Sequence, residues 1–169
     1  MPIHFEDVDV ASEVEGLRSA LIVPCNLCPA VTVATRENRP FLRFFRSPVK
    51  SAPFEAHLER LRSRLGEKGV RTKVFRSRLY HQWFMCMWTS RRRKKLEKEA
   101  KSHDAVIVLG CDSSRETVCD AVPAGVKVIE GMKTTGIMNG RLRFRLPGDL
   151  FFDQCKVVPI SQQKVAKGH

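Results

Sequence analysis

The chain has 169 residues, of which 43% are hydrophobic and 28% are charged, an ordinary balance for a soluble globular protein. This length is enough to bury a core without disulfides. The sequence contains no run of about 18 apolar residues, so we expect no membrane span. Its acidic start does not resemble a secretory signal. We therefore expect a cytoplasmic protein whose six cysteines act as ligands, reactive thiols or core residues.

The net charge of +12 is concentrated in one part of the sequence. Between residues 60 and 101 there are 15 Lys and Arg against three Glu, so this segment carries the whole excess. Such a concentrated positive field favours an anionic partner. The charge does not choose among an acidic protein, nucleic acid and a polyanionic small molecule. We expect an acidic protein, such as an electron carrier, to dock on residues 60–101. Nucleic acid is the alternative partner.

The predicted elements begin with a strand and two helices. Residues 17–23 end in an apolar run that breaks at a proline, which predicts a strand leading into a loop. A helix is expected to begin near Cys28 and Pro29, because proline is favoured in the first helical turn. Residues 51–66 form the clearest helix, with Ser51 as the candidate cap. One face of this helix is apolar: Phe54, Leu58, Leu61 and Leu65.

Strands and helices continue to alternate in the second half of the chain. The same criteria predict strands at 70–75 and 126–129 and a charged surface helix at 91–101. The strongest strand is 104–110, a continuous apolar run typical of a parallel strand covered on both faces. A short helix is expected over 112–122, capped by Ser113 or Ser114.

This alternation predicts an α/β fold with a mainly parallel sheet of about four to five strands flanked by helices. Residues 131–161 are richer in Gly and Pro. We expect them to form an irregular C-terminal extension along the sheet edge, with a turn at Asn139-Gly140. The predicted organisation is a single α/β metal-binding domain over residues 1–161, followed by a disordered or non-native tail at 162–169.

Four cysteines are the candidates for a metal site. Ligand sites of open α/β sheets lie beyond the carboxyl ends of the strands, and Cys25 and Cys111 each follow a predicted strand. Cys28 is three residues after Cys25, and the apolar residues before Cys155 could bring it to the same rim. Four thiolates suit Zn²⁺ or a [4Fe–4S] cluster, because both accept four sulfur ligands. The sequence therefore predicts a centre of Cys25, Cys28, Cys111 and Cys155, and leaves zinc and iron–sulfur open.

Other interpretations of the cysteines also stand. Cysteine serves as a small buried apolar residue in many proteins, and we expect this of Cys119 and Cys86, although Cys86 is also a candidate extra ligand. The pair Cys25 and Cys28 matches a thiol–disulfide oxidoreductase motif, in which a thiol at the start of a helix has a lowered pKa. The oxidoreductase interpretation gives no role to Cys111 and Cys155.

One part of the sequence resembles a known family. Residues 104–120 combine an apolar strand, Cys111 and a helix start, and Cys25 and Cys28 form an earlier Cys-x-x-Cys. This pattern resembles the cysteine-rich small subunit or C-terminal domain that accompanies methylenetetrahydrofolate reductase in anaerobes. The resemblance covers roughly residues 17–155. It implies an accessory metal or iron–sulfur protein for electron transfer or one-carbon metabolism, with the reductase as partner, rather than a free-standing catalyst.

Residues 80–95 combine aromatic side chains, methionines and a basic run, which suits a nucleic-acid-binding module with structural cysteines. The simpler interpretation is a buried apolar segment followed by a solvated helix face. His81 in this segment is a candidate ligand or base, whereas His57 is expected to be exposed on its charged helix. The sequence has no phosphate-cradling glycine motif, nucleophile elbow or paired carboxylates, so it does not identify a catalytic residue.

Overall fold

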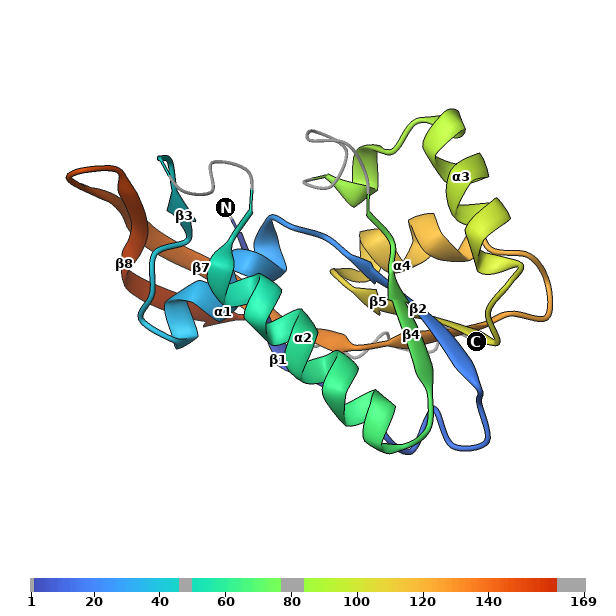
Figure 1. Cartoon of the computed structure of the whole chain (residues 1–169). Coiled ribbons are helices and arrows are strands. Elements are labelled where there is room, and N and C mark those ends of the chain that lie inside the picture. The colour runs from blue at the N-terminus through green and yellow to red at the C-terminus, as the bar shows by residue number, and fades with distance from the viewer. Residues whose placement is uncertain (1, 46–49, 77–83, 161–169) are drawn as a thin grey trace, which may run out of the picture.

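The computed structural model describes residues 2–45, 50–76 and 84–160, which form two four-stranded sheets and four α-helices (Figure 1). One sheet is parallel and the other is antiparallel. The predicted α/β fold with a parallel sheet is confirmed. The predicted tail at 162–169 lies outside the described residues. No helix in the described part of the chain is long and apolar enough to cross a membrane.

The elements are as follows. The parallel sheet consists of β2 (Ser19–Pro24), β4 (Arg71–Val74), β5 (Ala105–Leu109) and β6 (Lys127–Glu130). The helices are α1 (Cys28–Arg36), α2 (Ala52–Glu67), α3 (Ser90–Ala100) and α4 (Asp112–Cys119), and a short 3₁₀ helix, η2 (Met85–Met87), precedes α3. The antiparallel sheet consists of β1 (Ile3–Asp7), β3 (Leu42–Arg43), β7 (Met132–Arg145) and β8 (Asp149–Pro159).

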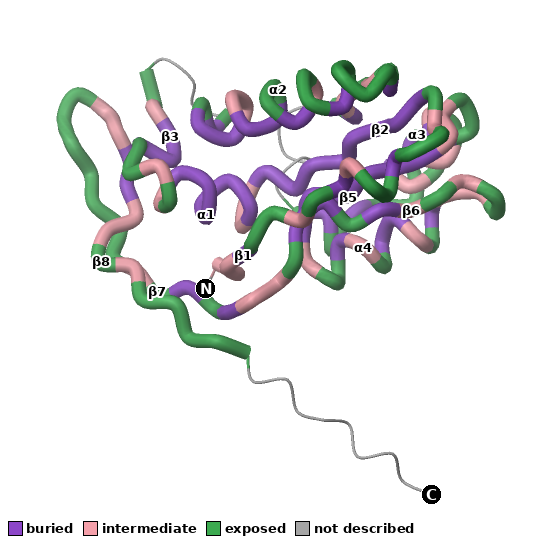
Figure 2. Tube along the Cα trace, turned by 90° about the horizontal axis from the view of Figure 1, so that it is seen from below, coloured by how far each residue is buried: buried purple, intermediate pink, exposed green. Residues whose placement is uncertain are grey.

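The parallel sheet has the strand order β4-β2-β5-β6 and is covered on both faces. In β5, Ile107 and Leu109 belong to the core shared with α1 and α2. The alternate residues Val106 and Val108 belong to the core shared with α3 and α4. Side chains of a strand point alternately to the two faces of the sheet, so a strand buried on both faces is apolar throughout. Figure 2 shows β2 and β5 buried along their length.

Helix α1 connects the two sheets. It begins at Cys28, as predicted, with proline in its first turn. Six consecutive residues, from Pro29 to Ala34, are buried, because α1 lies between α2 and β1 and also contacts β8 (Figure 2). The Thr32 hydroxyl donates a hydrogen bond to the Ile3 carbonyl at 3.1 Å. Packing on several sides thus stabilises a helix rich in β-branched residues, which have modest helix propensity.

The prediction of an irregular C-terminal extension is wrong. Strands β7 and β8 form a long antiparallel hairpin in a sheet of order β1-β7-β8-β3. Gly140 does not form the expected turn, because it lies inside β7 at a shift of register. A Cβ at this position would lie 2.7 Å from the sulfur of Cys155, so the glycine allows β8 to approach closely. The chain reverses instead at Pro147 and Gly148, where the Gly148 N–H donates to the Arg145 carbonyl at 2.9 Å.

The expectation that His57 is exposed is also wrong. Its ring is buried in α2, stacked on Phe54 with the ring centroids 6.1 Å apart. Its Nε2 atom lies 3.8 Å from an Asp7 carboxylate oxygen. Burial lowers the pKa of His57, while the Asp7 carboxylate opposes that shift. Charged neighbours in the sequence did not reveal that this side chain faces β1.

Candidate functional site

The carboxyl ends of β2 and β5 bring two of the predicted ligands together. These strands are neighbours in the sheet, with Pro24 opposite Leu109, and the Cys25 N–H donates to the Leu109 carbonyl at 2.8 Å. Cys25 therefore lies beside Gly110, where an added Cβ would be 3.4 Å from the Cys25 Cβ. Cys111 is the next residue along the chain. The structure thus brings Cys25 and Cys111 to one rim of the parallel sheet.

Two of the thiols stand at helix N-termini. Cys28 is the first residue of α1, and Cys111 is the N-cap residue of α4. The expectation that Ser113 or Ser114 caps this helix is wrong, since the helix already begins at Asp112. Ser114 is buried, and its Oγ lies 3.5 Å from the Cys111 sulfur. The positive end of a helix dipole stabilises negative charge, so both positions suit a metal-bound thiolate.

Cys86 also reaches this rim. It belongs to η2, which contacts α4. Electrostatic interactions link Cys25 with Cys28 and Cys111, and link Cys28 with Cys111 and Cys86. We call these four residues the cysteine rim. The expectation that Cys86 is a core residue is wrong, because Met85 is the buried residue of η2 and Cys86 is exposed.

The thiols of Cys25 and Cys28 resist deprotonation. Burial raises the pKa of Cys25 from 9.0 to about 11, and nearby Cys28 and Cys111 add to the increase. Backbone hydrogen bonds with Met85 and Leu27 oppose this shift. Burial is also the main cause of a raised pKa at Cys28. An oxidoreductase motif requires the opposite shift, whereas a bound metal cation removes thiol protons itself.

Cys155 lies elsewhere, in β8. Its sulfur is 3.9 Å from the Thr35 hydroxyl oxygen and 3.8 Å from the Asp153 carbonyl oxygen. Thr35 follows Cys28 by seven residues in α1, so the two positions are about 10 Å apart along the helix axis. The structure therefore brings together three of the four predicted ligands and leaves Cys155 apart. Cys119, expected in the core, is only half-buried at the end of α4.

The rim thiols interact without converging on a single point. Among the described residues, no group of three or more His, Cys, Asp and Glu side chains could hold a metal ion as it stands. A single Zn²⁺ requires sulfur atoms about 2.3 Å from one centre. An iron–sulfur cluster spreads its ligands more widely, because each iron takes its own thiolate. His81, the other candidate ligand, lies outside the described residues.

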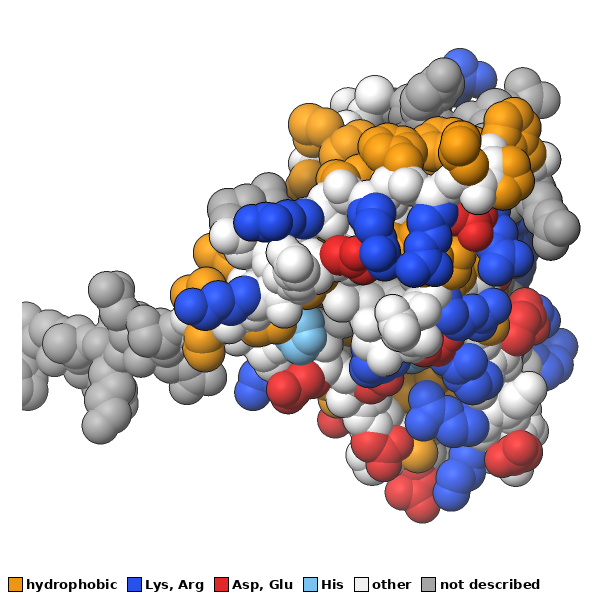
Figure 3. All heavy atoms as spheres, turned by 90° about the vertical axis from the view of Figure 1, so that its left-hand side faces the viewer, with side chains coloured by type: hydrophobic (Ala, Val, Ile, Leu, Met, Phe, Trp, Pro, Cys, Tyr) orange, Lys and Arg blue, Asp and Glu red, His pale blue; other side chains and the backbone are white. Residues whose placement is uncertain are grey.

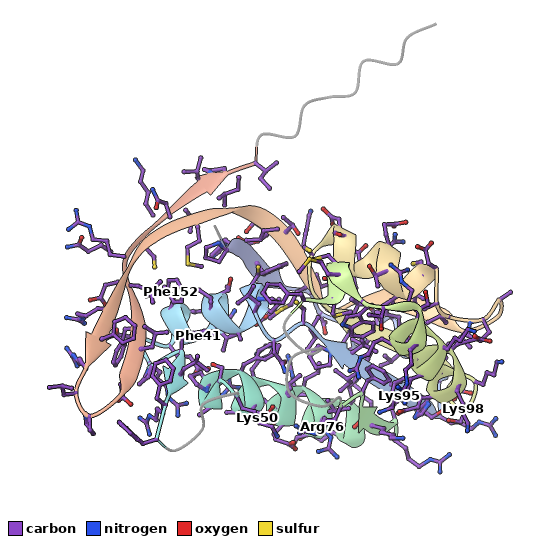
Figure 4. All side chains as sticks on the ribbon, turned by 90° about the horizontal axis from the view of Figure 1, so that it is seen from above. Phe41, Lys50, Arg76, Lys95, Lys98 and Phe152 are labelled. Atoms are coloured by element: carbon purple, nitrogen blue, oxygen red, sulfur yellow. The ribbon has the colours of Figure 1, made fainter. Side chains whose placement is uncertain are left out.

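The basic segment 60–101 lies mainly on α2 and α3, on either side of the edge strand β4. Figure 4 shows Lys50, Arg76, Lys95 and Lys98 along one edge of the molecule. Several cations of the segment are neutralised by ion pairs, including Arg76 with Glu55 at 3.0 Å. Others have no ion pair with a described residue: Arg64, Lys68, Arg71, Arg91, Lys94 and Lys98. The accessible positive charge on α3 is thus carried mainly by its outer lysines.

Two of the three described aromatic residues next to this basic surface are not available to stack on nucleic-acid bases, whereas Phe84 is 43% exposed. Phe75 and Trp88 are both buried. The Arg92 guanidinium covers them, 4.7 Å from the Phe75 ring centroid and 4.9 Å from that of Trp88. These residues form a cation–π cluster inside the protein. Tyr80 and Trp83 lie outside the described residues.

Comparison of the chain with protein-family models, curated protein sequences and solved structures gives no match. The resemblance to the reductase-associated family stays a prediction.

Proposed function

We propose that the protein binds an iron–sulfur cluster of the [4Fe–4S] type at the cysteine rim and acts as an accessory or electron-transfer protein. One observation carries this proposal: Cys25 and Cys111 follow adjacent parallel strands and lie beside Cys28 at the start of α1. The thiols of Cys25 and Cys28 thus meet that of Cys111, from a distant part of the chain, where open α/β sheets bind their ligands. When bound, the cluster would supply one-electron transfer.

The protonation of the thiols favours a metal ligand over a redox disulfide. Thiol–disulfide exchange depends on a thiolate near neutral pH, and a raised pKa at both Cys25 and Cys28 works against it. A metal offsets the cost of thiolate formation by coordination. The redox interpretation also gives Cys111 no role.

The separation of the thiols favours a cluster over zinc. The rim sulfurs are close enough to affect one another electrostatically but do not form a site for a single ion. Zn²⁺ bound by the same cysteines is the alternative, and it requires the rim to contract around one centre.

We assign the fourth ligand to Cys86 in place of Cys155. Cys86 is exposed on a single turn of 3₁₀ helix and interacts electrostatically with Cys28. Cys155 would have to leave Thr35 and move along most of α1 to reach the same position. An exposed ligand also gives a cluster a route for electrons to the surface.

We further propose an acidic partner protein that docks on residues 60–101. The outer lysines Lys94 and Lys98 of α3 lack ion pairs with described residues, and α3 begins at Ser90, shortly after η2, which carries Cys86. A partner on α3 would thus approach the rim. The resemblance described above would make that partner a methylenetetrahydrofolate reductase, a role in one-carbon metabolism.

Purification without oxygen tests the proposed function. Iron, acid-labile sulfide and zinc are measured per chain, together with visible absorption. We expect brown protein with about four iron and four sulfide per chain. Colourless protein with one zinc per chain would contradict the cluster and support the alternative, zinc at the same rim. Protein that contains neither metal contradicts the proposal.

A further inference from the structure

The tip of the β7–β8 hairpin and the adjacent β3 expose a group of large apolar side chains. Leu146, next to the turn, is 98% exposed and Phe45 is 81% exposed. We call the group the apolar tip: Phe44, Phe45, Leu142, Phe144 and Leu146. The hairpin extends beyond the helices at one end of the molecule (Figure 1). A contiguous exposed apolar surface of this kind marks a binding site.

The apolar tip is ordered by its own contacts. The rings of Phe44 and Phe144 are stacked with their centroids 6.3 Å apart. The Phe45 ring lies against Gly148, where an added Cβ would be 2.7 Å from the ring. The Phe44 N–H donates to the Gly148 carbonyl at 2.9 Å, which ties the end of β3 to the turn. The surface is therefore already assembled before any partner binds.

Arginines accompany the apolar side chains. Arg141, Arg143 and Arg145 alternate with Leu142 and Phe144 along β7. Figure 3 shows a band of hydrophobic side chains on this face with Lys and Arg side chains beside it. Arg143 pairs with a carboxylate of β8, but Arg141 and Arg145 have no carboxylate partner within the described ranges. The Arg145 guanidinium lies over the Phe151 ring, 5.1 Å from its centroid. The tip thus combines exposed apolar groups with two guanidinium groups that form no ion pair with a described residue.

We propose that the apolar tip attaches the protein to the surface of an anionic lipid bilayer. A projecting turn with Leu146 and Phe45 at its end is shaped to enter the interfacial layer, where apolar side chains leave water. Arg141 and Arg145 would then reach lipid phosphate groups, which guanidinium binds with paired hydrogen bonds. The charge of the arginines is complementary to that of anionic lipids.

The shape of the tip favours a bilayer over a protein groove or a small ligand. The hollow at the tip, lined by residues that include Arg43, Phe45 and Asp149, has a volume of about 210 Å³, which is small for a ligand site. Leu146, the most exposed side chain of the tip at 98%, is not among the residues that line this hollow. A bilayer accepts such a projection without a matching cavity. This attachment is independent of the metal proposed for the cysteine rim.

Generic electrostatics must be separated from insertion, because a protein with a net charge of +12 is attracted to any anionic surface. The two contributions differ in their dependence on salt. Attraction between exposed charges is largely screened at about 1 M ionic strength, whereas apolar burial is not. Substitutions at the tip should therefore reduce the salt-resistant apolar contribution to binding, and substitutions on α3 the salt-sensitive electrostatic contribution.

Co-sedimentation with vesicles of phosphatidylcholine, with or without phosphatidylserine, tests the proposal on the full chain. The double variant F45S/L146S is compared with K94S/K98S, which removes exposed charge from α3. We expect the tip variant to lose vesicle binding by at least about tenfold at both low and high salt. The α3 variant should lose only the salt-sensitive part. Circular dichroism checks that both variants fold.

A second readout uses the variant L146W. Its added fluorescence should shift to the blue with phosphatidylserine vesicles and be quenched by brominated acyl chains. Unchanged vesicle binding by F45S/L146S overturns the proposal, as does a tryptophan at position 146 that stays in water. Concentration-dependent self-association that F45S/L146S abolishes, without vesicle binding by the original chain, would assign the tip to a second copy instead and also overturn it.

Discussion

The sulfur of Cys155 lies 3.9 Å from the hydroxyl of Thr35, two helical turns along α1 from Cys28. This relationship separates Cys155 from the cysteine rim, although its position after an aromatic run had suggested a ligand. Cys86, which interacts electrostatically with Cys28, is the fourth ligand that we propose in its place. Replacing Cys86 and replacing Cys155 should therefore have different effects on metal binding.

Replacing Cys86 by serine should lower the metal content of anaerobically purified protein, because it removes the proposed fourth ligand. Replacing Cys155 by serine should leave the metal content unchanged, because that thiol lies against Thr35, Gly140 and its own strand, away from the rim. Metal analysis of both variants measures the difference. Loss of metal in C155S with retention in C86S would contradict this assignment and would make Cys155 the fourth ligand, as the sequence predicts.

In metal-free protein, Cys25 should react slowly with iodoacetamide. Its pKa of about 11 leaves almost no thiolate at pH 8, and its side chain is buried. Cys86, which is exposed, should be alkylated first. Mass spectrometry of peptides after timed labelling measures both rates. Equal labelling of Cys25 and Cys86 at pH 8 is incompatible with the buried position.

Stability should fall as the pH drops below about 6.5, in part because of His57. Burial lowers the pKa of His57 in the folded state, and Arg36, Arg60 and Arg64 act in the same direction against Asp7. The unfolded chain then binds more protons than the folded one, so acid favours unfolding and the contribution of His57 is present above pH 6.5. H57Q should show a shallower loss of unfolding free energy in urea between pH 7 and 5. If H57Q loses as much unfolding free energy between pH 7 and 5 as the original chain, His57 is not the cause of the pH dependence.

Two glycine substitutions should have opposite effects on stability. A Cβ at Gly110 would lie 2.7 Å from the Cβ of Ser114, which is buried in α4, so G110A should destabilise the protein by about 1–3 kcal/mol. Gly66 lies in α2 with nothing within 4 Å of an added Cβ. G66A should therefore stabilise by about 0.5–1 kcal/mol. Urea unfolding curves of the two variants measure both values, and destabilisation by G66A would contradict the open surroundings of that position.

The parallel half of the fold was predictable because its signals are local. A strand buried on both faces is apolar throughout, as residues 105–109 are. The start of α1 is indicated by the proline in its first turn. The antiparallel half was not predictable. From Arg141 in β7 to Pro147 in the turn, seven consecutive residues are exposed, so alternation at the end of the strand does not mark a core. The Asn139-Gly140 turn signal was overridden by pairing across β7 and β8.

The positions of three site cysteines could be predicted from the sheet topology. Cys25 and Cys111 follow strands whose carboxyl ends share one edge, and Cys28 is fixed to Cys25 by the chain. The place of Cys86 depends on which residue of a single 3₁₀ turn faces inward, and the packing of Met85 decides that. A Met-Cys-Met sequence carries no periodic signal for this choice.

The metal content of C111S relative to C119S tests the central claim most directly. Both cysteines belong to the α4 segment, Cys111 as its N-cap residue at the rim and Cys119 as its last residue. A serine at either position is close in size, so circular dichroism should show both variants folded. We predict that C111S loses the bound metal and its visible absorption while C119S retains both. Equal metal content in the two variants, whether high or low, would contradict the proposed centre.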